Sequence, residues 1–139
     1  MSHISKIELV ITSLDDLREA SKQLEFTFAE NQKTYQWYGE WMGDTPLPEG
    51  ITTEMLGKCD HAISVPGCEY QIGVVKRDNH YILLWDSWRK GNLQKKIGKN
   101  AGILKQAYAA VKIRSQAMIK KYHISEKKTK QGLRLTLTV

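Results

Sequence analysis

Cys59, Asp60 and His61 are the closest group of potentially reactive side chains in the sequence, and Cys68 follows nine residues after Cys59. In an extended segment Cys59 and His61 would share a face and could, with Cys68, provide three zinc ligands. A fourth ligand would have to come from a distant histidine, and no Cys-x-x-Cys pair is present. A nucleophilic cysteine–histidine pair would need a third, orienting group. We therefore expect two structural thiols, no metal site and no catalytic residues.

Asp86 is the carboxylate best placed for a specific role, because it lies between Trp85 and Trp88. Alternation along a strand would put Asp86 and Trp88 on one face and Trp85 on the other. The carboxylate could hydrogen-bond an amino or hydroxyl group of a ligand. Alternatively, it could form a structural pair with a lysine of the following helix. Asp86 and Trp88 are thus candidate ligand-binding residues.

Two glycines, Gly98 and Gly102, bracket Lys99 and Asn100 in a basic helical segment. Glycine inside a helix costs roughly 1 kcal/mol relative to alanine, so we expect an interruption, with Asn100 capping the main helix. The N–H groups between the glycines, beside Lys99, would form an anion-binding nest. A packing kink is the alternative interpretation. The candidate ligand-binding residues of this region are Arg89, Lys95, Gly98, Lys99, Asn100 and Gly102.

An aromatic group between residues 35 and 41 could also contact a ligand. Tyr35, Trp37, Tyr38 and Trp41 could form a stacking platform for a nucleobase, because an aromatic face binds any base without hydrogen-bond readout. They could equally fill the core of a small domain, as tryptophan and tyrosine usually do. Trp37 and Trp41 are the candidate ligand-binding residues of this group.

A strand and a capped helix open the chain. Ile4–Ile11 is rich in β-branched residues and predicts a strand. Ser13 precedes Asp16 at the spacing of a capping box, so residues 14–24 should be helical. The expected core face of this helix is Leu14, Leu17, Ala20, Ser21 and Leu24.

The middle of the chain predicts a hairpin, a loop and three strands. Phe26 and Phe28 alternate on one side of a polar turn, and Tyr35 and Trp37 alternate on the other, so residues 25–38 predict a hairpin. Residues 43–57 are rich in glycine and proline and predict a loop with one helical turn at 53–56. Strands are expected at 61–65, 69–76 and 81–88, joined by short turns into a meander.

A long amphipathic helix and a final strand complete the predicted elements. The apolar or small residues of the helix recur in steps of four and three. They are Leu93, Ile97, Ala101, Leu104, Tyr108, Val111, Ser115, Met118 and Tyr122. A polar segment, 127–132, follows, and alternation from Leu133 to Val139 predicts a strand with one face buried. We predict one α+β domain, residues 1–139, with a mainly antiparallel sheet and one short and one long helix on one face.

Charge is unevenly distributed along the 139 residues. Residues 1–69 carry 5 Lys/Arg and 12 Asp/Glu, whereas residues 70–139 carry 16 and 3, which gives the whole chain its net charge of +6. A basic half of this strength attracts phosphates, acidic proteins or anionic surfaces without specifying which. The acidic half could instead lie against it and neutralise part of the charge.

The chain lacks the sequence motifs of several functional classes. The chain contains no P-loop, no dinucleotide-binding glycine motif and no carboxylate pair at a spacing typical of hydrolysis. It also has no signal-peptide pattern and no apolar run near the roughly 20 residues of a membrane span. We expect a cytoplasmic protein without a cofactor.

Several segments resemble the DUF1257 family, also called Ycf35-like, which has bacterial, phage and plastid members. The resemblance is carried by MSHISKIELVITSLDDL, CDHAISVPGCEYQIGVV, YILLWDSW, GKNAGILKQAY and the basic helix-to-strand ending. It implies a small α+β domain with no established enzymatic activity and no catalytic residues to transfer. Genes of such proteins often lie near those of AAA-type ATPases, which implies an accessory role.

These observations predict a non-enzymatic binding module for an anionic ligand, either a nucleotide-like small molecule or a nucleic acid. The alternative is a protein-interaction adaptor, accessory to an AAA-type ATPase, that uses the charge asymmetry to dock an acidic partner. An enzyme is disfavoured because no catalytic group is apparent. The expected partners are the anionic ligand, a protein or a second copy of the chain, and no membrane.

Overall fold

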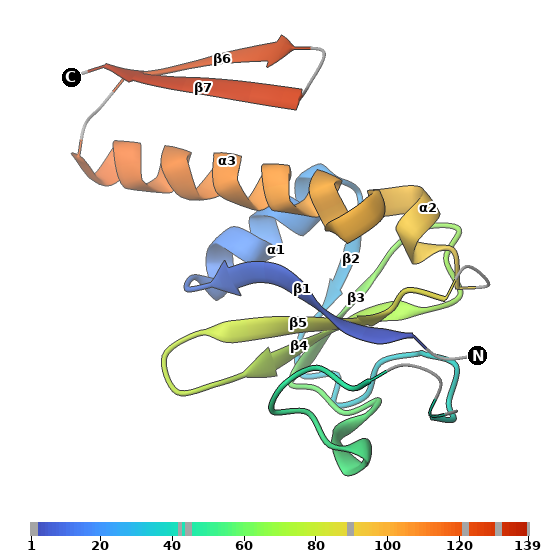
Figure 1. The fold of residues 1–139 in the computed structure, drawn as a ribbon. Helices are drawn as coiled ribbons and strands as arrows, with labels where there is room; N and C mark the ends of the chain where they lie inside the picture. Colours follow the sequence, from blue (N-terminus) through green and yellow to red (C-terminus); the bar gives the residue numbers. More distant parts are fainter. Residues whose placement is uncertain are drawn as a thin grey trace.

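The computed structural model describes residues 3–41, 43, 46–88, 91–120, 123–129 and 132–138. For residues 118–120 and the last two ranges, the description covers the backbone. A five-stranded antiparallel sheet with the order β1-β5-β4-β3-β2 forms the centre (Figure 1). Its strands are β1 (Ile4–Ile11), β2 (Thr27–Ala29), β3 (His61–Ser64), β4 (Gln71–Lys76) and β5 (Tyr81–Asp86).

Strands β3, β4 and β5 form the predicted meander, and β1 pairs with the far side of β5. Ile4 lies opposite Asp86, and Ile7 lies opposite Leu83. The register shifts between Ile7 and Ile11, so the pairing of β1 with β5 is irregular there. This long-range pairing brings the start of the chain beside residues 85–87, and the candidate site depends on it.

The predicted helices cover one face of the sheet (Figure 1). They are α1 (Leu14–Gln23), α2 (Leu93–Ile97) and α3 (Gly102–Lys120), with a 3-10 turn, η3 (Lys99–Ala101), between the last two. The predicted α+β architecture, with a short and a long helix on the sheet, is therefore confirmed.

Ser13 caps α1 as predicted, but the reciprocal half of the capping box is replaced by contacts with α3. The Ser13 hydroxyl accepts a hydrogen bond from the Asp16 backbone N–H at 3.2 Å. The Asp16 carboxylate accepts one from the Ser115 hydroxyl at 2.7 Å, and the Ser13 N–H donates to the Tyr108 hydroxyl. The start of α1 is thereby tied to α3.

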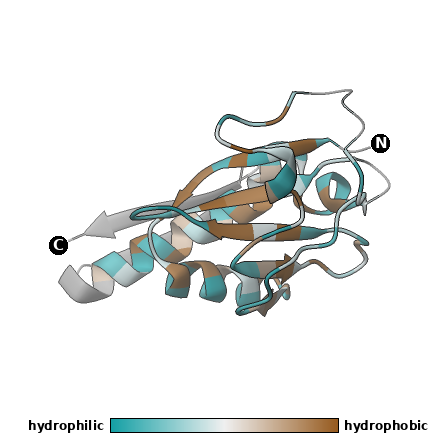
Figure 2. Cartoon of the chain, turned by 90° about the horizontal axis from the view of Figure 1, so that it is seen from below, coloured by the Kyte–Doolittle hydropathy of each residue, from teal (hydrophilic) through white to brown (hydrophobic). Residues whose placement is uncertain are grey.

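The predicted apolar faces of the helices meet the sheet in the larger hydrophobic core. Leu17 and Ala20 of α1 and Leu104 of α3 are fully buried in this core, where they join Leu83 of β5. Figure 2 shows hydrophobic residues along the central strands. The face predicted for the long helix is confirmed as far as Val111, whereas the Met118 side chain and Tyr122 lie outside the described residues.

Residues 33–41 and 46–58, which include the 3-10 turn η1 (Thr53–Met55), cover the opposite face of the sheet (Figure 1). A second core forms there, with Tyr35 and Leu56 of this segment against Ala62 and Leu84 of the sheet. Strand β5 is therefore buried on both faces, which explains its continuous apolar sequence.

The hairpin predicted at residues 25–38 is wrong. Strand β2 pairs with β3, with Phe28 opposite Ile63. The segment after it instead runs beside the loop and β4, where the Tyr35 N–H donates to the Gly57 carbonyl and the Gln71 N–H to the Gln36 carbonyl. The apolar second face of the sheet needs a cover, and the aromatic segment supplies it.

The last two strands, β6 (His123–Thr129) and β7 (Gly132–Thr138), form a separate two-stranded sheet beyond α3 (Figure 1). The predicted final strand is confirmed as β7. Its partner β6 was not anticipated, because residues 127–132 look like a polar segment in the sequence. The predicted burial of one face of β7 concerns side chains outside the described ones.

Candidate anion-binding site

The site is built on the short segment α2–η3, which links β5 to the long helix. Leu93 and Ile97 are fully buried and anchor α2 to the core. Gly98 ends α2 with a φ of 87°, a conformation that favours glycine. Because only one side of α2 faces the core, Gln94 and Lys95 remain exposed on the other.

An open surface hollow of about 440 Å³ lies against this exposed side. We call it the lysine hollow, and it is lined by Asn92, Gln94, Lys95 and Lys99. Among the described residues, no carboxylate lies within ion-pair distance of either lysine. The side chains of two lysines and two amide residues therefore line one concave surface, and the Asn92 amide also donates to the Gly67 carbonyl at 3.2 Å. The two positive charges suit this surface to a phosphate-sized anion.

A second hollow of about 240 Å³ lies between β1 and η3, and we call it the polar pocket. Four consecutive residues of β1, from Ser5 to Glu8, line it. Successive strand side chains point to opposite faces, so a pocket that touches four in a row lies along the strand edge. The other side is formed by Ser87, Gln94 and Asn100, and Gln94 also lines the lysine hollow.

Two hydroxyl groups in the polar pocket have fixed hydrogen-bond partners. The Trp85 indole N–H donates to the Ser5 hydroxyl oxygen at 2.8 Å. The Ser87 hydroxyl donates to the His3 carbonyl at 3.1 Å, and the Ser87 backbone N–H donates to the same oxygen. Both serines are thus held in defined orientations.

The helix interruption predicted near Lys99 is confirmed, but Asn100 does not cap the main helix. Asn100 has a φ of 61°, and Ala101 separates it from Gly102, where α3 begins. The Ala101 N–H already donates to the Gly98 carbonyl at 3.0 Å. The proposed nest therefore lacks one of its donors, because the tight turn between the two helices uses it. Asn100 contributes its side chain to the polar pocket instead.

The Asp86 carboxylate is held by backbone groups of the protein. Its side chain is completely buried and accepts hydrogen bonds from the backbone N–H groups of His3, Tyr38 and Trp88, all at 2.9 to 3.0 Å. The carboxylate thus joins the start of β1, the aromatic segment and the end of β5. The expectation of a ligand contact or a lysine pair is replaced by three backbone donors, because these three chain segments converge at residue 86.

The three candidate tryptophans lie at two different cores. Trp88 packs at the edge of the larger hydrophobic core. The centre of its ring lies 5.2 Å from the centre of the His3 ring, in an edge-on arrangement. Trp37 and Trp41 pack against the second core, across the sheet. Trp37 and Trp41 are thus distant from the lysine hollow because the sheet separates them, and Arg89 lies outside the described residues.

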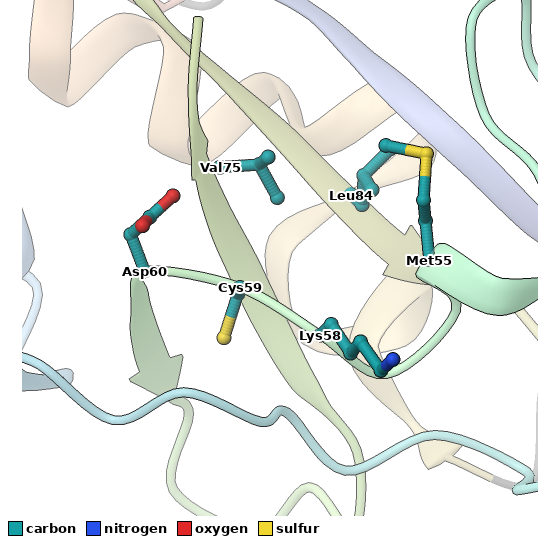
Figure 3. A pocket seen from close by; sticks show the side chains of 6 residues that line it. All are labelled: Met55, Lys58, Cys59, Asp60, Val75 and Leu84. Atoms are coloured by element: carbon teal, nitrogen blue, oxygen red, sulfur yellow. The ribbon is translucent and has the colours of Figure 1, made fainter.

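Cys59 and Asp60 line a third hollow of about 200 Å³, together with Val75 and Leu84 (Figure 3). Burial raises the pKa of Cys59 to about 11, and its thiol donates to the Gln32 carbonyl at 3.2 Å. The Asp60 carboxylate accepts from the Lys76 N–H at 2.7 Å. These contacts hold the segment in place and leave the thiol protonated at neutral pH.

His61 also has a structural partner. Its Nδ1 accepts a hydrogen bond from the Asn31 backbone N–H at 2.9 Å, and burial lowers the pKa of the imidazole. Cys59 and Cys68 are both free thiols, and within the described ranges no group of three potential metal ligands is present.

The β1 residues of the polar pocket were missed by the sequence analysis. Ser5 and Ser87 are 82 positions apart in sequence, and no local pattern relates them. The alternation of β1 identifies Ser5 as a strand residue but does not identify its neighbour on the next strand.

Comparison with protein-family models, curated proteins and solved structures finds no match to this chain. The resemblance to the DUF1257 family therefore stays a prediction. Within the part of the chain that the structure describes, no helix combines the length and hydrophobicity of a membrane span.

Proposed function

We propose that this protein is a non-enzymatic binding module for an anionic ligand, of the nucleotide-like or nucleic-acid class. The observation that carries the proposal is the lysine hollow, in which Lys95 and Lys99 share one concave surface with the amides of Asn92 and Gln94. The two lysine ammonium groups and the Gln94 amide can donate hydrogen bonds, and the two positive charges favour a phosphate group. The Asn92 amide already donates to the Gly67 carbonyl.

The basic half of the chain adds a longer-range contribution. Residues 70–139 carry 16 Lys/Arg and 3 Asp/Glu, and this excess contains the α2–η3 segment. A positive field of this kind increases the local concentration of anions and their rate of association. Cys59, Asp60 and His61 form hydrogen bonds within the fold, so the proposal gives these three residues structural roles.

Calorimetric titration of Lys99→Gln and Lys95→Gln tests the proposal, with nucleoside monophosphates, inorganic phosphate and a short single-stranded oligonucleotide as probes at low salt. Each substitution should weaken binding about fivefold to tenfold, or about 1 to 1.4 kcal/mol. Lys22→Gln, an exposed lysine on α1, is the matched control and should have little effect. Equal effects of all three substitutions, or no binding of any probe, would contradict a site at the lysine hollow.

A protein-interaction adaptor is the second candidate function, and the charge asymmetry favours it. Arg18 forms ion pairs with Asp15 and Glu30, so these pairs lie within the acidic half of the chain. The resemblance to the DUF1257 family suggests an AAA-type ATPase as the partner. Saturating binding of such an ATPase, unaffected by Lys95→Gln and Lys99→Gln, would favour this function over the first.

A further inference from the structure

The lysine hollow and the polar pocket adjoin each other but differ in charge. Gln94 lines both, so the two hollows meet at this residue, beside α2 and η3. The lysine hollow carries two positive charges, from Lys95 and Lys99, whereas the polar pocket carries Lys6 and Glu8, whose charges cancel. A ligand that spans both would therefore place its anionic group in the first and an uncharged group in the second.

The hydrogen-bonding groups of the polar pocket match a hydroxylated or amide-bearing ring. The Ser5 oxygen accepts from Trp85, which leaves its own hydrogen to donate to a ligand. The Ser87 hydrogen is donated to His3, which leaves its oxygen as an acceptor. The Asn100 and Gln94 side chains each offer a donor and an acceptor. The pocket can thus satisfy paired donor and acceptor groups on a small polar molecule.

The shape of the pocket favours a small molecule over a polymer. An uncovered strand edge can accept an extended peptide, but here η3 packs beside β1 and covers part of that edge. The space that remains is bounded by the strand edge on one side and by Gln94 and Asn100 on the other. A single ring fits such a confined space, whereas a continuing chain would have to pass η3.

We propose that the ligand is a phosphorylated small molecule with a polar ring, such as a mononucleotide or a sugar phosphate. Its phosphate lies at Lys95 and Lys99, and its ring lies in the polar pocket between Ser5, Ser87 and Asn100. This inference rests on the proposed function, and it selects a small ligand from the wider anionic class.

Calorimetry with a graded set of probes tests the inference. The set comprises inorganic phosphate, ribose 5-phosphate, the nucleoside 5′-monophosphates, the corresponding nucleosides and a short single-stranded oligonucleotide. We expect at least one of the phosphorylated ring compounds to bind tenfold or more tightly than inorganic phosphate, and the nucleosides to bind more weakly than their phosphates. Equal affinity for ribose 5-phosphate and the nucleotides would identify the sugar phosphate as the recognised unit, and preference for nucleotides would identify the base as part of it.

Two variants locate the ring. Asn100→Gly removes the side chain but tolerates the φ of 61°, and Gln94→Ala removes an exposed amide from α2. Both should reduce the advantage of the ring compounds over inorganic phosphate about fivefold or more. Gln116 is an exposed glutamine on α3, and Gln116→Ala should leave the advantage of the ring compounds over inorganic phosphate unchanged. Thermal melting of each variant confirms that the fold is retained.

The outcomes separate this inference from the proposed function. Inorganic phosphate that binds as tightly as every ring compound would overturn the inference, and so would an oligonucleotide that binds more tightly than any mononucleotide. In both cases, if Lys95→Gln and Lys99→Gln weaken the binding of the probes, the proposed anion site at the lysine hollow is still supported. Failure of all probes to bind would overturn both.

Discussion

At the scale of single residues, groups that look reactive in the sequence hold the fold together. Asp86 is placed between two tryptophans like a ligand contact, yet its two oxygens accept three backbone N–H groups in a fully buried position. Charge-assisted hydrogen bonds of this kind are stronger than neutral ones. A buried carboxylate needs hydrogen-bond donors, and this need could be predicted from the residue type. That the donors are backbone N–H groups could not.

His61 should make the stability of the protein depend on pH. Burial lowers its pKa below the ordinary value of 6.5, and its Nδ1 must stay unprotonated to accept from Asn31. The unfolded chain then binds the proton more readily than the folded one, so this contribution to stability is complete above pH 6.5 and is lost as the pH falls below it. Urea unfolding between pH 7.5 and 5 measures the effect.

The His61→Asn variant is the control for this prediction. The Asn oxygen can replace Nδ1 as an acceptor but does not titrate. The decrease in stability below pH 6.5 should therefore be smaller in the variant than in the wild type. Parallel pH profiles for the two proteins would show that His61 is not the group responsible.

At the scale of elements, periodicity identified the helices and their buried faces, because a helix of this kind gains most of its stability by burying an apolar side. The same argument failed for residues 25–38. Alternation marks a segment as extended, but it does not name the surface that the segment covers. Tyr35 is 3% exposed because it covers the second face of the sheet, next to Ala62 and Leu84.

The register of α3 is tested by Leu104→Ala. Leu104 is fully buried in the larger core, so its truncation should lower the free energy of unfolding by about 2–5 kcal/mol. Ile103→Ala is the neighbouring control, because Ile103 is 45% exposed and its loss should cost about 0.5 kcal/mol or less. Urea denaturation of both variants provides the comparison, and similar losses would mean that the helix faces are assigned wrongly.

At the scale of the whole molecule, the chain divides into a layered body and a terminal hairpin. The central strands of the five-stranded sheet are paired on both sides and covered on both faces, whereas β6 and β7 pair only with each other and lie alongside α3 (Figure 1). An isolated two-stranded hairpin is marginally stable in water. The two parts should therefore differ in local stability.

Native-state hydrogen exchange at increasing urea concentrations measures this difference. The amides of β4 and β5 should exchange through global unfolding, with the full free energy of unfolding. The amides of β6 and β7 should exchange through a local opening of lower free energy that depends weakly on urea. The same free energy for both sheets would show that the hairpin folds as one unit with the body.

The sequence by itself determined the local features of this protein: the bounds of β1, the cap of α1, the meander and the interrupted basic helix. All of these depend on residues within one or two turns or strands, where spacing decides the geometry. The tertiary structure decided the partner of β2, the covering of the second face and the polar pocket. Ser5, Ser87 and Asn100 meet only because β1 pairs with β5 and η3 packs beside β1, and no local pattern encodes contacts between such distant segments.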